Sequence, residues 1–171
     1  LVPVAGPEAG DTSDHGEAIF EHESFGHSLN LYREAIHVPL ILIYPRRVPA
    51  GIRDSRMANL ADLPRTVFDL LGLESPFAGH SLIPSANDAK EVEWMAFSDL
   101  LFWGQSAHTV SFVTQRWHWL RYPDGRMELF DWQSDRQEVR NVSQLEANRG
   151  VVQMFEEATR AAGGKVDVSK K

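Results

Sequence analysis

The first half of the chain contains one continuous apolar run and one segment in which apolar residues recur at helical spacing. Residues 40–44 read Leu-Ile-Leu-Ile-Tyr, which is typical of a strand buried on both faces of a sheet. Apolar residues recur at helical spacing from Leu60 to Leu71, with Asp62 as a candidate N-cap and Gly72 as a natural stop. We therefore expect a buried strand followed by a helix, and a loop or frayed end over residues 1–11.

The second half is built from short β-branched or aromatic runs separated by turn signals. These runs cover residues 94–98, 109–114, 117–122 and 127–132. Asp124 and Gly125 lie between the last two runs and predict a tight hairpin, because both residue types tolerate positive φ. Ser143 and Glu146 match a capping box for a helix that Gly163 ends. The pattern predicts a small antiparallel sheet with one packed helix.

Composition limits the classes of function. The 171 residues are 43% hydrophobic and 24% charged, which suits one folded core or a main core with a satellite. A net charge of −7 argues against nucleic acid as a partner. No apolar run approaches the roughly 20 residues that a membrane span needs. Cysteine is absent, which removes disulfides and thiolate metal sites.

Candidate chemistry begins at Asp14 and His15. A carboxylate and an imidazole suit a divalent cation, and Gly16 allows the backbone to turn sharply beside them. On residue types alone, a solvated loop without a metal is the alternative. The surrounding sequence favours the metal site over the solvated loop.

Four segments, taken in order, resemble motifs of the sulfatases of the alkaline phosphatase superfamily. They are residues 12–17 (Thr-Ser-Asp-His-Gly-Glu) with the following 31–41, residues 62–73 (Asp-Leu-Pro-Arg-Thr to Leu-Leu-Gly-Leu), residues 79–84 (Gly-His-Ser-Leu-Ile-Pro), and residues 128–131 with 138–141 (Glu-Leu-Phe-Asp and Glu-Val-Arg-Asn). Because the motifs occur in family order, together they are far more specific than any one of them.

The resemblance implies an α/β fold. We expect part of an alkaline-phosphatase-like sheet with helices, followed by a small antiparallel sheet packed on a C-terminal helix. Residues 1–90 would be the C-terminal part of the catalytic α/β domain, and residues 91–171 a small α+β subdomain.

The resemblance also implies roles for three residues. Asp14 and His15 would be metal ligands, and His27 would contact the sulfuryl or phosphoryl oxygens of the substrate. A surface histidine on a loop is the alternative for His27. The cation would be calcium in a sulfatase, or manganese or zinc in a phosphate-ester relative. His15 replaces the asparagine of many calcium-type members, which favours a transition metal slightly.

The family nucleophile is not found in this sequence. It is a formylglycine made within a Cys/Ser-x-Pro-x-Arg motif, and no such motif occurs here. The chain therefore resembles the C-terminal portion of a sulfatase-like sulfuric ester hydrolase, and we expect negligible activity from it alone. A sulfate or phosphate ester would be the substrate of the complete enzyme.

Two alternatives remain open. The first is part of a phosphodiesterase, phosphonate monoester hydrolase or phosphoglycerol transferase of the same superfamily. The second is a non-catalytic remnant that acts as an association module. Such a remnant would form a homo-oligomer through the apolar surface beside residues 40–44.

Overall fold

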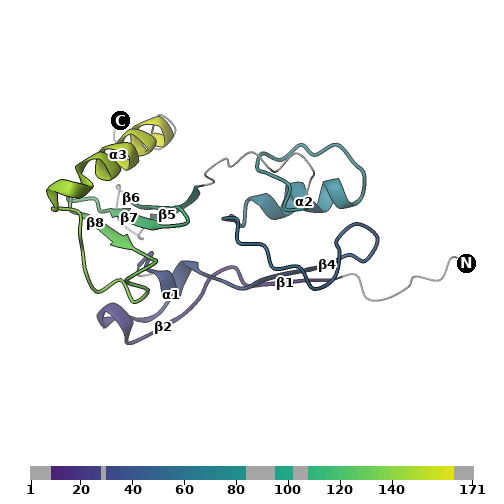
Figure 1. Cartoon of the computed structure of the whole chain (residues 1–171), viewed down its shortest axis with the longest axis horizontal. Helices are drawn as coiled ribbons and strands as arrows, with labels where there is room; N and C mark the ends of the chain where they lie inside the picture. Colours follow the sequence, from purple (N-terminus) through teal and green to yellow (C-terminus); the bar gives the residue numbers. More distant parts are fainter. Residues whose placement is uncertain (1–8, 28–29, 84–94, 102–107, 164–171) are drawn as a thin grey trace, which may run out of the picture. The chain divides into compact units, whose positions relative to one another are not determined.

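The computed structural model describes residues 9–27, 30–83, 95–101 and 108–163. These residues belong to two compact units (Figure 1). The first unit comprises Leu1–Asp14 and Val38–Trp94, and the second comprises His15–His37 and Met95–Lys171. Within the described ranges, no helix has both the length and the apolar content needed to cross a bilayer.

The first unit contains a two-stranded antiparallel ribbon. Strand β1 (Ala9–Thr12) pairs with strand β4 (Leu40–Ile43), and the Thr12 hydroxyl donates a hydrogen bond of 2.8 Å to the carbonyl of Pro39. The strand expected at residues 40–44 is thus confirmed, but its burial on both faces is wrong, because Ile41 is 52% exposed. The expectation of a loop or frayed end over residues 1–11 is wrong for residues 9–11, which belong to β1, and residues 1–8 lie outside the described part of the chain. Pairing with β4 provides hydrogen-bond partners for the backbone of these residues. The pattern of apolar side chains in the sequence gives no sign of this pairing.

Helix α2 (Asp62–Leu70) also belongs to this unit. Asp62 is its first residue rather than its N-cap, and the buried carboxylate accepts hydrogen bonds from the backbone N–H groups of Asn59 and His80, both at 2.8 Å. The helix ends as expected before Gly72, whose φ of +70° suits a residue without a Cβ. Asp62 therefore joins His80 to the start of α2.

The second unit is built on a four-stranded antiparallel sheet in the order β5-β6-β7-β8. The strands are Ala96–Leu101, His108–Val113, Trp117–Arg121 and Met127–Asp131. Gly125, with φ of +85°, makes the turn between β7 and β8. The predicted antiparallel sheet and hairpin are confirmed.

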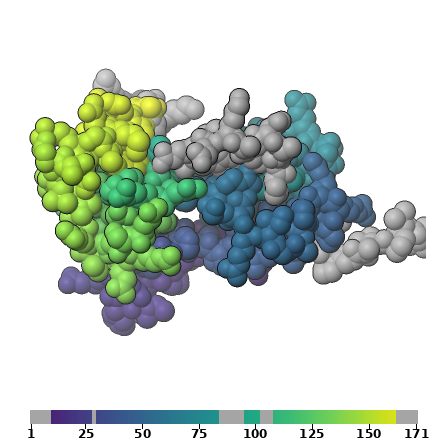
Figure 2. Space-filling model, viewed as in Figure 1, coloured from purple at the N-terminus to yellow at the C-terminus, as the bar shows by residue number. Residues whose placement is uncertain are grey.

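Helix α3 (Arg149–Gly163) covers one face of this sheet. Phe155 packs there against Trp119 and Leu129, and the space-filling view shows yellow α3 against the green part of the chain (Figure 2). The predicted C-terminal helix is confirmed, but its capping box is wrong. The Ser143 hydroxyl donates to the carbonyl of Met127 instead, and a short 3-10 turn, η2 (Glu146–Asn148), precedes the helix.

The opposite face of the sheet is covered by part of the segment formed by residues 15–27 and 30–37. Leu31 packs on Leu120 and Phe130, next to helix α1 (Arg33–Ile36). The same segment forms a small hairpin from β2 (Ala18–Ile19), a 3-10 turn η1 (Glu21–Glu23) and β3 (Phe25–Gly26). Strands β6, β7 and β8 are therefore largely buried on both sides. The division of the chain at residue 90 stays a prediction.

Candidate metal and anion site

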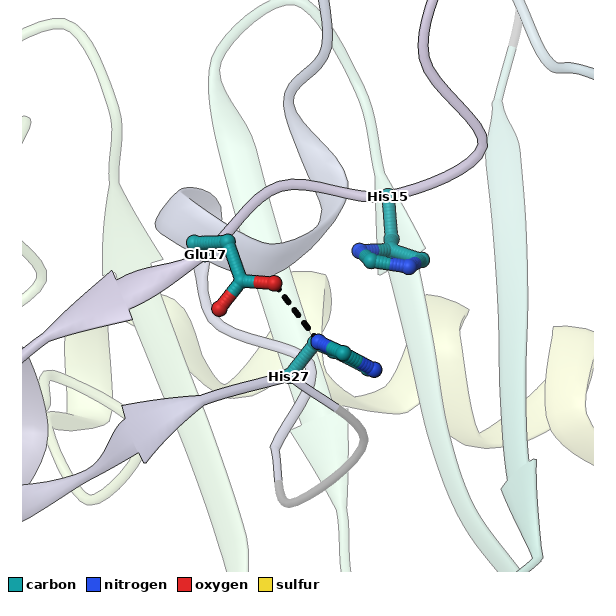
Figure 3. A group of neighbouring side chains, drawn as sticks. All are labelled: His15, Glu17 and His27. Atoms are coloured by element: carbon teal, nitrogen blue, oxygen red, sulfur yellow. Dashed lines mark hydrogen bonds and ion pairs between the residues drawn. The ribbon is translucent and has the colours of Figure 1, made fainter.

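Three side chains with metal-ligand atoms gather beside the β2–β3 hairpin (Figure 3). Glu17 immediately precedes β2 and His27 immediately follows β3, so the pairing of Ala18 with Gly26 brings them together. His27 Nδ1 donates a hydrogen bond of 2.6 Å to Glu17 Oε1, and the ring of His15 stacks on that of His27 with centroids 4.2 Å apart. One ligand atom from each residue lies within 4.8 Å of the others.

Gly16 fixes where the chain passes between His15 and Glu17. Its N–H donates a hydrogen bond of 2.8 Å to the carbonyl of Ala35. A Cβ at this position would collide with the backbone carbonyl oxygen of Glu34. The chain can lie this close to helix α1 only because residue 16 is glycine.

His22 ties the hairpin to the rest of the second unit. Its Nδ1 lies 2.8 Å from Glu34 Oε1, its Nε2 lies 3.1 Å from the carbonyl oxygen of Glu138, and its ring stacks on Tyr32 with a centroid distance of 3.7 Å. Burial lowers the pKa of His22, but the hydrogen bonds with Glu34 and Glu138 outweigh it, so the pKa lies above its ordinary value. This histidine has a structural role in positioning the hairpin.

Glu138 is the centre of a buried polar network beneath this segment. It is 2% exposed and accepts hydrogen bonds from His118 Nδ1, Trp132 Nε1 and the backbone N–H of Arg33, the last at 2.8 Å. Burial raises the pKa of Glu138, while the bond to His118 and the other donors lower it by more, so the carboxyl has a pKa below its ordinary value. The charge is stabilised by donors from the sheet and from α1.

Contacts link Ser111 to His118 and His118 to Glu138, as serine, histidine and acid are linked in a hydrolytic triad. The serine hydroxyl lies 2.7 Å from His118 Nε2. Ser111 and His118 are both 0% exposed. A substrate has no access to a hydroxyl buried in this way. The network therefore supports the fold and is not a nucleophile site.

The predicted site residues fall in different places. His15 and His27 are brought together in the second unit, whereas Asp14 is an exposed residue of the first unit. Glu17 was not among the predicted ligands. The signal for it is present in the sequence, since Glu17 follows Gly16 in the 12–17 motif, but the hairpin that brings it to His27 was not predicted.

Most of the chain matches a known protein family. Residues 20–162 match the family described as N-sulphoglucosamine sulphohydrolase, C-terminal. The chain belongs to this sulfatase family. Its mixed α/β fold, with a four-stranded antiparallel sheet and a C-terminal helix, matches portions of solved sulfatase structures.

Curated relatives include arylsulfatase K of several vertebrates. The human protein is 31% identical over 146 residues, which cover 77% of this chain and 27% of that protein. Arylsulfatase K of Danio rerio is 33% identical over 144 residues, with the same two shares. The chain thus spans about a quarter of the length of the curated relatives that it matches.

Solved structures show the same fold. BT4656, in complex with its substrate D-glucosamine-2-N,6-O-disulfate, has a TM-score of 0.79 at 23% identity, covering 95% of this chain and 35% of that one. The phosphonate monoester hydrolase of Agrobacterium radiobacter has a TM-score of 0.73 at 20% identity, covering 90% and 34%. Identities this low establish the fold alone.

Proposed function

We propose that this chain supplies part of the active site of a metal-dependent sulfuric ester hydrolase. Asp14 and His15 would bind the divalent cation, and His27 would contact the ester oxygens. The observation that carries the proposal is the stacking of His15 on His27, with ring centroids 4.2 Å apart. The stacking places His15, a residue type that binds metal ions, beside His27, which can donate a hydrogen bond to an anion.

Each residue has a distinct part in this chemistry. A bound cation would supply Lewis acidity toward the ester. The Glu17 carboxylate accepts from His27 Nδ1 and so orients the ring, which leaves Nε2 to donate to an ester oxygen when the imidazole is protonated. Gly16 and the hairpin hold both histidines in place before substrate arrives.

The family typically uses calcium, yet the donors around His15 fit a softer cation better. Calcium prefers six to eight oxygen ligands, whereas His15 offers an imidazole nitrogen beside the carboxylate of Asp14. This donor set favours the second candidate, a phosphate-ester or phosphonate-ester hydrolase using manganese or zinc. The nucleophile in either case would come from residues outside this sequence.

The test uses the complete gene product that contains this chain, with the 171-residue chain in parallel. Aryl sulfate and aryl phosphonate esters are assayed with calcium, manganese or zinc. We expect turnover by the complete product, negligible turnover by the chain alone, and a loss of at least about 100-fold in Asp14→Asn and His15→Ala. His27→Ala should reduce kcat, by about 100-fold if it acts on developing charge. Unchanged rates in all three variants would overturn the proposal.

A further inference from the structure

His22 lies in the turn of the β2–β3 hairpin, between two oxygen acceptors. Its Nδ1 is 2.8 Å from Glu34 Oε1, and its Nε2 is 3.1 Å from the backbone carbonyl oxygen of Glu138. A carbonyl oxygen accepts and never donates, and a neutral imidazole carries an N–H on one of its two nitrogens. Between a carboxylate and an imidazole, the proton goes to the imidazole because it is the stronger base. The two contacts together therefore indicate an imidazolium.

The surroundings of His22 favour this charged form. The side chains of His22 and Glu34 are each 15% exposed, which limits the screening of their ion pair by water. The Tyr32 ring stacks on the imidazole with a centroid distance of 3.7 Å, and the face of an aromatic ring attracts a cation. Burial lowers the pKa of His22, and the bonds to Glu34 and Glu138 raise it by more. The titratable groups around the ring are Glu34 and Tyr32 at α1, Glu138 with its bonded His118, and Glu21 and Glu23 on its own turn.

The backbone on both sides of this contact has a conformation that residues other than glycine seldom adopt. His22 has a φ of +50° and Glu138 a φ of +54°, both in the left-handed region. Phe20 and Glu23, in the same turn as His22, have φ values of +73° and +55°. Such conformations cost energy and persist only where surrounding contacts hold them. The two hydrogen bonds of the imidazolium are contacts of this kind.

The hairpin that His22 anchors carries part of the candidate site at its base. His27 directly follows β3, and its ring stacks on His15 (Figure 3). Residue 16 is bonded to the carbonyl of Ala35 in α1, and Glu34 of the same helix holds His22. We propose that His22 is a positioning residue of the proposed hydrolase, whose imidazolium holds the hairpin so that His27 faces the ester oxygens. This inference rests on the proposed function and adds a residue that acts through His27 rather than on the substrate.

The first experiment follows the imidazole nitrogens of His22 by heteronuclear NMR in the 171-residue chain. We expect both ring nitrogens to carry protons in most molecules at pH 6.5, the ordinary pKa of histidine, because the folded state raises the pKa of His22. Glu34→Gln keeps an acceptor oxygen but removes the negative charge, so the titration midpoint of His22 should fall. A neutral ring at that pH, or a midpoint that Glu34→Gln leaves unchanged, would overturn the proposal.

A second measurement tests the position of His27 without turnover. The rings of His15 and His27 stack with centroids 4.2 Å apart, which should give nuclear Overhauser contacts between their ring protons. His22→Gln offers one donor nitrogen in place of two, so these contacts should be lost or clearly weakened. His37→Gln makes the same change at an exposed histidine of the same unit, whose Nδ1 is 3.5 Å from the Arg33 guanidinium, and should leave them intact. Equal contacts in the two variants, with circular dichroism showing both folded, would overturn the proposal.

Turnover by the complete gene product separates positioning from general stability. His22→Gln should lower kcat and kcat/KM together by at least about tenfold, since displacing a catalytic group by about 1 Å can cost on the order of 100-fold. In a double-mutant cycle, His22→Gln should add less than about twofold to the loss caused by His27→Ala, because it acts through His27. His27 also loses its proton as the pH rises, so the cycle, and not a pH–rate profile, assigns the effect to His22. Losses that multiply in the cycle would overturn the proposal.

The two proposals fail separately. If Asp14→Asn, His15→Ala and His27→Ala all keep full turnover, the hydrolase site is overturned, and NMR still decides whether His22 is an imidazolium that holds the hairpin. If those variants lose turnover while His22→Gln keeps it, the hydrolase proposal stands and the positioning role is overturned. Glu34→Gln weakens the same anchor without removing the ring, so it replaces His22→Gln in both assays if that variant does not fold.

Discussion

The two units use similar apolar runs with opposite results. Strand β4 in the first unit is almost wholly apolar, yet Ile41 and Ile43 are 52% and 42% exposed. Strands β7 and β8 in the second unit bury Trp119 and Leu129 on one face and Leu120 on the other. The difference lies in what covers each strand. β7 and β8 have α3 on one side and residues 31–36 on the other, whereas β4 has β1 as its sheet partner.

The largest effect should come from removing the buried carboxylate of the second unit. Glu138→Ala leaves His118 and Trp132 Nε1 without their buried acceptor. Breaking a buried pair in this way costs about 3–5 kcal/mol, which urea unfolding would measure. Glu146→Ala removes one partner of the exposed Glu146–Arg149 pair and should leave the unfolding midpoint nearly unchanged. Equal effects in the two variants would contradict the structural role given to Glu138.

The same leucine-to-alanine change in the two units tests the comparison directly. Leu129 is 0% exposed, so Leu129→Ala should destabilise the chain by about 2–5 kcal/mol. Leu40 is 37% exposed in β4, and Leu40→Ala should cost clearly less, about 1 kcal/mol or below. Thermal unfolding of both variants measures the difference. A cost at Leu40 as large as that at Leu129 would mean that β4 is covered in solution.

A pair of glycines allows a similar test near the candidate site. Gly16→Ala places a methyl group against the Glu34 carbonyl, and overpacking of this kind costs about 1–3 kcal/mol. Gly10→Ala meets no atom within 4 Å and should be close to neutral. Gly16→Ala should also lower turnover by the complete gene product, because it displaces the segment that carries His15. Retained stability and turnover would show that the close approach of residue 16 to α1 is not needed.

Exposed β4 also predicts self-association of the isolated chain. An uncovered apolar strand is a surface on which a second copy can pack. Light scattering should show oligomers that increase with concentration, and Ile41→Lys should shift the chain toward monomer. Val139→Lys changes another exposed apolar residue, in the second unit, and should leave association unchanged. Monomers at high concentration would argue against this surface as an interface.

The smallest effect concerns pH. Because the folded state raises the pKa of His22 above 6.5, its protonated form adds stability that is fully present below that value. The contribution should fall as pH rises through the raised folded pKa. His22→Gln should remove this part of the pH dependence of the unfolding free energy. If His22→Gln leaves the pH dependence of the unfolding free energy unchanged, the contacts of His22 do not raise its pKa.

Local patterns allowed much of the second unit to be predicted. The strands of the sheet and the turn at Gly125 depend on neighbours close in the chain, and both are confirmed. The helix stop expected at Gly163 and Gly164 falls where the described residues end, so it stays a prediction. The cap at Ser143 failed because Met127, distant in sequence, offers its hydroxyl a different acceptor. The same limit explains Glu17, whose contact with His27 needs a hairpin whose tip holds Phe20 at a φ of +73°. No apolar periodicity signals that turn.

The amino-acid sequence by itself determined the family, through four motifs in order, and the elements formed by local spacing. Tertiary structure alone decided which strands are covered, which carboxylate joins the two histidines, and which glutamate is buried. His22 and Glu138 are 116 residues apart in sequence and yet share a hydrogen bond. Such contacts depend on how separate elements pack, because burial and hydrogen-bond partners are set by neighbours in space rather than by neighbours in the chain.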